Sequence, residues 1–460
     1  MTVYLITCCY ACNPVKGTNE ADAQEADSLF NASFLSNTQW PSYRGYLAAG
    51  FLSNAGLPDS WDLETSDNIL WRLPLPGMGL SCPVIWDNNI FITTAVGEQD
   101  DAGFRTGIYG DIEPVSDSSV HEWLVYCIDR HSGEIKWKRT AHRGVPSVKR
   151  HPKSTHANTS VAADGNYVVA FFGSEGLYCY DHRGEQVWKR DFGLINSAWD
   201  VYESAQWEFG SSPLIYDGKV IIQADALNTA FVAVLDLPSG DILWKQERNE
   251  ISTWCTPNVY MHGGNLRMVV NGFRHRGAYD LETGREIWKM SGGGDIPVPT
   301  PVNWEDLVIF NSAHGRDRPL MAVRKSAEGE IPYPAKEGSL PDQIAWFDNR
   351  SGPYMTSPLV YENLLYCLRW NGMLTCQDPL TGEVFYRETV FPGSFIASPV
   401  AADGKIFVVQ EEGTVYVIKA GKEYELLNTS SLGSVSLVSP GIAEDMIIFR
   451  TAKELIAVSE

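Results

Sequence analysis

The chain has 460 residues, of which 44% are hydrophobic and 12% aromatic, so it can bury a large core. Its formal net charge of -21 argues against nucleic acid and anionic lipid surfaces as partners, because both would repel it. The sequence contains no run of about 18 apolar residues, which argues against a transmembrane helix.

The first 38 residues precede the regular part of the sequence. Residues 1–12 have an apolar core and small residues before Cys12, but no Lys or Arg in front of it, so they form an incomplete secretory leader. Cys12 is a candidate for the lipid attachment of a bacterial lipoprotein, and the alternative is a cytoplasmic protein with a spurious leader. Residues 13–38 are polar and acidic, which predicts a flexible tether.

A strand ending in Asp, a turn ending in Gly and then a Trp recur along the chain in units of about 41 to 57 residues. Such a period indicates an array of equal supersecondary units. The instances are Cys127 to Trp137, Cys179 to Trp188, Val234 to Trp244, Ala278 to Trp288 and, with Phe in place of Trp, Cys376 to Phe385.

A second mark opens each unit: a Ser or Thr, often directly before Pro, leads into an apolar strand that turns on Asp-Gly or a near equivalent. Each unit then holds four short β-rich runs, and no apolar stretch of helical period interrupts them. The sequence therefore predicts an all-β protein in which residues 39–460 form one eight-bladed β-propeller with four-stranded antiparallel blades. The eight marks begin at Ser81, Thr159, Ser211, Cys255, Pro299, Thr356, Ala397 and Val438.

The last unit is one strand short. Only about three strands fit between Pro440 and Glu460. The segment Ile69 to Leu75 has the Trp and the polar-apolar alternation of an outer strand, yet it precedes the first unit. We expect it to pair into the C-terminal blade and to close the ring.

The Asp-x-x-x-Gly-x-x-x-Trp repeat resembles the tryptophan-docking motif of the quinoprotein (pyrroloquinoline quinone, PQQ) dehydrogenase propellers. It is also similar to that of their non-enzymatic relatives, including the propeller lipoprotein of outer-membrane protein assembly. More narrowly, residues 40–51 and 68–86 resemble envelope proteins described as PQQ-binding-like β-propeller repeat proteins. The resemblance implies that the following side chains dock one blade on the next: Trp71, Trp137, Trp188, Trp244, Trp288 and Phe385.

The nine cysteines do not form a disulfide framework. One pair is notable, because Asn371-Gly372 predicts a two-residue hairpin turn that would set Cys367 opposite Cys376. We expect two packed thiols there, and the alternative is a disulfide formed in an oxidising compartment.

Blade topology predicts which face carries function. The Asp-Gly and Ser/Thr-Gly turns share one face and are short, whereas the second-to-third-strand loops and the blade-to-blade crossings share the other. We call the latter the loop face, and its segments are irregular and rich in charge and aromatic residues. The candidate ligand-binding residues near its axis are Lys153, His156, Asn158, Trp207, Glu208, Asp225, Arg274, His275, His314, Arg316, Asp317, Arg369 and Trp370.

Basic and aromatic side chains in an otherwise acidic protein suit an anionic or sugar-like ligand. The structural alternative is that these loop charges are solvated or paired within the funnel. No His-x-x-x-His or Cys-x-x-Cys spacing points to a metal site, and we predict neither a metal nor a cofactor.

Three functions remain open. The first to consider is a non-catalytic binding or scaffold propeller of the periplasm or cell envelope, monomeric and either soluble or lipid-anchored. Its partner would be an envelope protein, a peptide or a glycan. The second function is a PQQ-dependent dehydrogenase with calcium, in which Glu208 and Asp317 would serve as metal ligand and base. The adjacent cysteine pair of the alcohol-oxidising members is missing from the array, because Cys8-Cys9 lies outside it. The third is a sugar-active lyase or hydrolase using Asp111 with Glu113, or Glu203 with Glu208.

Overall fold

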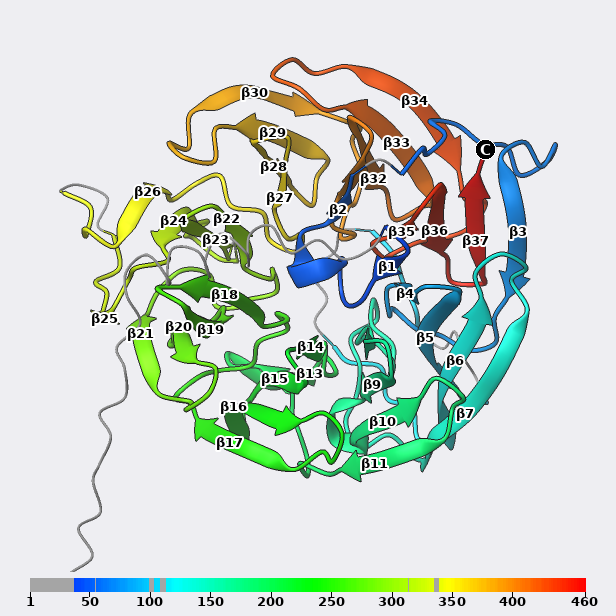
Figure 1. The fold of residues 1–460 in the computed structure, drawn as a ribbon, viewed down its shortest axis with the longest axis horizontal. Coiled ribbons are helices and arrows are strands. Elements are labelled where there is room, and N and C mark those ends of the chain that lie inside the picture. The colour runs from blue at the N-terminus through cyan, green and yellow to red at the C-terminus, as the bar shows by residue number, and fades with distance from the viewer. Residues whose placement is uncertain (1–36, 54, 99–102, 108–112, 313, 335–338) are drawn as a thin grey trace, which may run out of the picture.

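The computed structural model describes residues 37–53, 55–98, 103–107, 113–312, 314–334 and 339–460. These residues form eight antiparallel blades around a ring, which Figure 1 shows in chain order from blue to red. The predicted all-β, eight-bladed propeller is therefore confirmed. The leader, with Cys12 and Cys8-Cys9, and nearly all of the tether lie outside the described residues.

Within each blade the strands follow one another outward from the axis. Blades 1 and 2 consist of β4 Val84–Trp86, β5 Asn89–Val96, β6 His121–Asp129 and β7 Ile135–Gly144, then β8 Ala162–Ala163, β9 Tyr167–Phe171, β10 Leu177–Asp181 and β11 Gln186–Arg190. Blades 3 and 4 consist of β14 Leu214–Tyr216, β15 Lys219–Ala226, β16 Thr229–Asp236 and β17 Ile242–Glu247, then β18 Asn258–His262, β19 Asn265–Val270, β20 Arg276–Asp280 and β21 Glu286–Met290.

The second half of the ring repeats this order. Blades 5 and 6 consist of β22 Val302–Trp304, β23 Leu307–Asn311, β24 Leu320–Arg324 and β26 Ile344–Asp348, then β27 Leu359–Tyr361, β28 Leu364–Leu368, β29 Met373–Gln377 and β30 Val384–Thr389. Blades 7 and 8 consist of β31 Val400–Ala402, β32 Lys405–Val409, β33 Thr414–Lys419 and β34 Leu426–Ser431, then β35 Gly441–Ala443, β36 Met446–Arg450, β37 Glu454–Ser459 and β3 Ile69–Pro74.

Short elements complete the description. Strands β1 Gln39–Trp40 and β2 Phe51–Leu52 extend blades 1 and 7 at their inner edges, and β25 Gly329–Glu330 extends blade 4 at its outer edge. Strands β12 Ala198–Trp199 and β13 Tyr202–Gln206 form a separate two-stranded sheet. The 3₁₀ turns are η1 Tyr46–Ala48 and η2 Gly173–Glu175. No helix in the described part of the chain has the length and hydropathy to cross a membrane.

The ring closes as the sequence predicts. Strand β3 pairs antiparallel with β37, with Trp71 opposite Ala457 and Pro74 opposite Glu454. The Leu75 amide extends the ladder by donating to the Lys453 carbonyl at 2.9 Å. Because the two ends of the array share one sheet, the disc has no open blade edge at the closure point.

Tryptophan indoles dock successive blades. Trp71, Trp137, Trp188 and Trp244 each donate Nε1–H to a carbonyl of the following blade at 2.7 to 2.8 Å. Each ring covers a glycine with positive φ where a Cβ would lie only 2.5 to 2.7 Å away, so this turn requires Gly on two grounds. The four glycines are Gly133, Gly184, Gly240 and Gly284.

The other two predicted docking residues are placed differently. Trp288 is buried and donates to Tyr260 Oη of its own blade at 3.3 Å. The Phe385 ring faces the Lys422 ammonium at 4.4 Å. Trp346, which does not belong to the sequence repeat, donates to the Pro379 carbonyl at 2.8 Å and covers Gly382. Its Ile-x-Trp spacing is the signal that Trp137 and Trp244 also carry.

The predicted pairing of Cys367 with Cys376 is wrong by one residue. Arg369 pairs with Met373 across a three-residue loop, so Cys367 lies opposite Thr375 and Tyr366 lies opposite Cys376. A one-residue slip moves a side chain to the other face of the sheet. The two thiols accordingly lie in different hydrophobic clusters, and both are free and buried.

Residues 40–52 cross the middle of the ring, where Figure 1 shows η1 and its flanking strands in blue. The buried Arg44 guanidinium donates to the carbonyls of Pro358 and Pro399 in blades 6 and 7 at 2.9 and 3.0 Å. On another side, the Asn258 amide of blade 4 donates to the Leu47 carbonyl at 2.8 Å. This axial plug therefore ties several blades together at the centre.

Candidate functional site

The second residue of each opening mark takes part in a ring of hydrogen bonds around the axis. In seven of the eight blades this residue is Ser or Thr, and its hydroxyl accepts the backbone N–H of the equivalent residue in the preceding blade at 2.8 to 3.2 Å. In blade 1 the residue is Cys82, whose thiol accepts a hydrogen bond from the Ser439 amide. The ring runs through Cys82, Ser160, Ser212, Thr256, Thr300, Ser357, Ser398 and Ser439.

A cavity of about 810 Å³ lies against this ring. Its base includes Ser160, Ser212, Thr256 and Thr300 of the ring, together with Tyr43 of the axial plug. Its sides come from blade-to-blade crossings and second-to-third-strand loops. The cavity therefore lies at the axis on the loop face.

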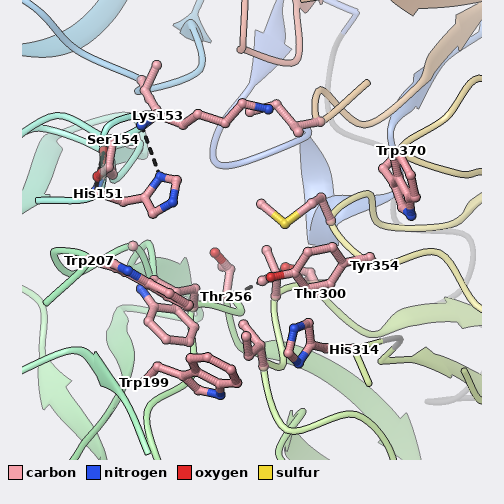
Figure 2. A pocket seen from close by; sticks show the side chains of 18 of the residues that line it. His151, Lys153, Ser154, Trp199, Trp207, Thr256, Thr300, His314, Tyr354 and Trp370 are labelled. Carbon is pink, nitrogen blue, oxygen red and sulfur yellow. Dashed lines mark hydrogen bonds between the residues drawn. The ribbon is translucent and has the colours of Figure 1, made fainter. Parts of the chain in front are cut away.

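Aromatic side chains form one side of the cavity (Figure 2). The rings of Trp199 and Trp207 stack with centroids 5.9 Å apart, and Trp254 lies 5.7 Å from Trp207. Trp370 lies across the open space from them in Figure 2. Hydrogen bonds hold two of the indoles, because Trp199 donates to Asp295 and Trp254 donates to the Glu208 carbonyl.

The charged groups lining the cavity are all basic. They are Lys153, Arg318 and Arg369, with the imidazoles of His151 and His314, and no Asp or Glu among the residues that the structure describes lines it. The Lys153 ammonium is held at 2.5 Å by Glu411, a fully buried carboxylate that also accepts the Gly107 amide. Burial, and then the nearby charges of Arg387 and Arg318, lower the pKa of Arg369, so these three guanidinium groups lie close enough to repel one another.

A buried acid–base pair lies beside the aromatic wall. His156 Nδ1 and Glu208 Oε2 are 2.6 Å apart, and both side chains are more than 95% buried. Burial lowers the pKa of His156 to about 4 and raises the pKa of Glu208 to about 8. Both shifts favour a neutral pair at pH 7, in which the carboxyl O–H donates to the imidazole.

The structure brings six of the thirteen predicted residues to the cavity. His156 and Glu208 are buried beside it without lining it, and the remaining five lie elsewhere. The six lining residues are Lys153, Asn158, Trp207, His314, Arg369 and Trp370.

The remaining predicted residues have other surroundings. Asp225 is buried inside blade 3, where Arg248 binds it at 2.8 Å. Arg274 pairs with Asp200 at 3.0 Å, and His275 pairs with Glu286 at 2.5 Å. Arg316 and Asp317 precede the lining residue Arg318 but do not line the cavity themselves. The sequence interpretation omitted Trp199, Trp254, Tyr354, Arg318 and His151, although each lies on a crossing or loop of the predicted face.

The residues present do not fit a PQQ–calcium site. Within the described ranges, no three His, Cys, Asp or Glu side chains are placed to hold a metal ion. Glu208 is bound to His156, and neither Glu208 nor Asp317 lines the cavity. For acid–base chemistry, Glu203 is exposed on the β12–β13 hairpin whereas Glu208 is buried, and Asp111 lies outside the described residues.

An eight-bladed disc closed by an N-terminal strand, with tryptophans docked on glycine turns, defines a quinoprotein-like β-propeller. A family model described as outer membrane protein assembly factor BamB matches residues 121–340 and 277–459. The chain belongs to this PQQ-like propeller family.

Individual relatives are distant. The chain is 21% identical to outer membrane protein assembly factor BamB of Shewanella oneidensis over 350 residues, which cover 73% of this chain and 79% of that protein. Its 21% and 25% identities to the proteins of the same name from Yersinia pestis and Escherichia coli cover 54% and 45% of this chain. The matches span only about half of those two relatives, 52% and 49% of their length.

Solved structures share the fold. The BamB structure from Moraxella catarrhalis superposes with a TM-score of 0.53 at 14% identity, covering 77% of this chain and 99% of that one. Quinohemoprotein alcohol dehydrogenase from Comamonas testosteroni gives a TM-score of 0.60 at 12% identity, covering 96% of this chain and 84% of that one. At these identities the likeness concerns the fold alone, and it does not choose between a binding propeller and an oxidoreductase.

Proposed function

We propose that this chain is a non-catalytic binding propeller of the bacterial cell envelope, which holds an envelope protein partner on its loop face. Family membership supports the envelope setting, because the relatives are described as outer membrane protein assembly factors. In this proposal the propeller works in the periplasm as a monomer, and Cys12 is the candidate lipid anchor.

The β12–β13 hairpin is the observation that carries the proposal. It is a two-stranded sheet that joins no blade among the described residues, so its strands offer edges to which a partner strand can add. Val201 and Tyr202 at its turn are 59% and 53% exposed, and Leu194 just before it is 50% exposed. Exposed apolar residues on a projecting element are typical of protein–protein contacts.

The preceding crossing extends this surface. Val145, on the way from blade 1 to blade 2, is 51% exposed. The Lys149 amide of the same crossing donates to Gln206 Oε1 of β13 at 3.1 Å, so the two crossings are in contact. Together they form an apolar rim beside the axial cavity.

Site-specific photo-crosslinking in the native cell tests the proposal. A photoreactive residue at Val201 should capture one defined envelope protein, and Val201→Lys should abolish co-purification of that protein. Leu243 is the matched control, because it is 52% exposed but lies on the outer strand β17. Equal capture from both positions, or capture of a cytoplasmic protein at Val201, would contradict the proposal.

The proposal also predicts an enzymatic result. We expect the purified chain, supplied with PQQ and calcium, to show no dye-linked oxidation of alcohols or sugars. Turnover under these conditions would favour the dehydrogenase alternative instead.

A further inference from the structure

The charged side chains that line the axial cavity are basic, whereas the protein as a whole is acidic. The chain carries 57 acidic and 36 basic residues, yet the described residues that line the cavity include two arginines and a lysine and no carboxylate. A chance sample of this acidic chain would favour the opposite balance. The cavity is therefore built to receive negative charge.

Two of the lining cations have no counter-ion among the described residues, although the Arg369 guanidinium already donates to the Arg350 carbonyl at 2.6 Å and to Met373 Sδ at 3.7 Å. No carboxylate in the described part of the chain lies within ion-pair distance of Arg318 or Arg369, whereas Lys153 is already bound by Glu411. Asp348 acts on Arg369 only as a weaker, opposing charge. Neighbouring guanidinium groups that repel each other are stabilised when an oxyanion lies between them, and their planar forks match a carboxylate.

The rest of the lining suits a ring that is apolar on its faces and rich in oxygen at its edge. Indole planes pack against the C–H faces of a pyranose, and Trp199, Trp207 and Trp370 present such planes (Figure 2). At the base, the hydroxyls of Thr256 and Thr300 belong to the ring of hydrogen bonds. The Thr256 hydroxyl accepts the Ser212 amide and the Thr300 hydroxyl accepts the Thr256 amide, so each has its own O–H left to donate to a ligand oxygen.

We propose that the axial cavity binds an acidic sugar, a pyranose that carries a carboxylate, either free or at the end of a glycan chain. Arg318 and Arg369 bind the carboxylate, the tryptophans stack on the ring, and the hydroxyl ring hydrogen-bonds its edge. A volume of about 810 Å³ is ample for a sugar of one or two rings. The cavity adjoins the protein-binding rim, because Trp199 and Tyr202 of the β12–β13 hairpin also line it. Val201 does not line the cavity and Arg318 lies outside the hairpin, so their variants test the two proposals independently.

Titration calorimetry of the purified chain with galacturonate, and with galactose as its neutral counterpart, tests the proposal. We expect galacturonate to bind at least about 10-fold more tightly, as one charge-assisted contact provides. The preference should shrink as salt is raised. Trigalacturonate separates the two sources of ligand: tighter binding than galacturonate indicates a chain end, and equal binding indicates the free sugar.

Matched variants locate the site. Arg318→Gln should lower galacturonate affinity about 10-fold and leave galactose unchanged, because the exposed Arg318 side chain is bound by no other side chain in the described part of the protein. Arg316→Gln, two residues away and outside the cavity, should change neither affinity by more than about twofold. Trp370→Leu should weaken both sugars by the same factor, because stacking does not distinguish charge.

Three results would overturn the proposal. The first is equal affinity for galactose and galacturonate, or no galacturonate binding at millimolar concentration. The second is equal behaviour of the Arg318 and Arg316 variants with circular dichroism spectra unchanged. The third is tight binding of PQQ that galacturonate does not displace, since the cavity would then select an aromatic carboxylate.

Discussion

Replacing Glu208 with Gln should change how the stability of the propeller depends on pH. Burial raises the pKa of Glu208 from its ordinary value of 4.5 to about 8. Over that interval the unfolded chain releases a proton that the folded chain retains. The native carboxyl therefore contributes stability at low pH and loses it as pH rises toward 8.

The window from pH 6.5 to 8 isolates this effect. The lowered pKa of His156 works in the opposite direction, but mainly at lower pH, because above its ordinary value of 6.5 the imidazole is mostly neutral in both states. In this window a buried carboxyl with a raised pKa lowers the free energy of unfolding by up to about 1.4 kcal/mol per pH unit, or by about 2 kcal/mol across the whole window. Glu175, whose pKa burial and the Glu208 charge raise to about 7, adds a smaller loss of the same sign.

Urea denaturation at pH 6.5, 7, 7.5 and 8, followed by tryptophan fluorescence, measures the difference. Wild-type protein should lose about 2 kcal/mol of unfolding free energy across the window, and Glu208→Gln should lose much less. Glu203→Gln is the control, because Glu203 is exposed on the same crossing. Parallel pH profiles for wild type and Glu208→Gln would refute the reasoning.

Three further predictions test the architecture, each by thermal or urea unfolding. Trp71→Ala should lower the free energy of unfolding by about 3–5 kcal/mol, because Trp71 docks the closing blade as Trp137 docks a blade within the ring. Trp137→Ala should have a similar effect, and a much smaller loss for Trp71→Ala would contradict the role of β3 in ring closure. Gly184→Ala should cost at least about 1–3 kcal/mol, since φ is +82° and the new Cβ would meet the Trp137 ring at 2.7 Å, and a neutral result would contradict that geometry. Cys82→Ser should be neutral or stabilising by about 1 kcal/mol, because a hydroxyl accepts the Ser439 amide better than a thiol does, whereas Cys376→Ser should destabilise; equal losses would argue against the ring.

The eight blades could be predicted because their signals are local. The Gly of each turn and the Trp about four residues after it lie within one unit, so they appear in sequence as a fixed spacing, although the indole covers the Gly turn of the following blade. Ring closure could also be predicted, since a surplus outer strand at residues 69–75 matched a missing one at the end. Trp346 was not predicted as a docking residue, because the insertion before it replaces the Asp and Gly of the motif.

Features that depend on contacts between distant parts of the chain were harder to predict from the sequence. The sequence around Asn371-Gly372 allows two- and three-residue turns, and the difference of one residue changed which face Cys367 occupies. For the cavity, the topology identified the correct crossings but not the rotation of each side chain. Asp225 and His275 therefore met buried or local partners, whereas Trp199 and Arg318, from segments already singled out, reached the cavity.

The ring of opening hydroxyls separates the fold from its function. Each hydroxyl accepts the amide of the preceding blade, so the inner ends of all eight blades are fixed relative to one another without any contribution from the crossings that start above them. The crossings can then differ in length and charge without changing how the blades are placed, as the crossing with the β12–β13 hairpin and the crossing with Lys153 do. Because hydroxyls that hold the ring also form the base of the cavity, any ligand that binds there contacts the side chains that join the blades. Selectivity must then come from the crossings and loops, where Trp207, Arg318 and Trp370 lie.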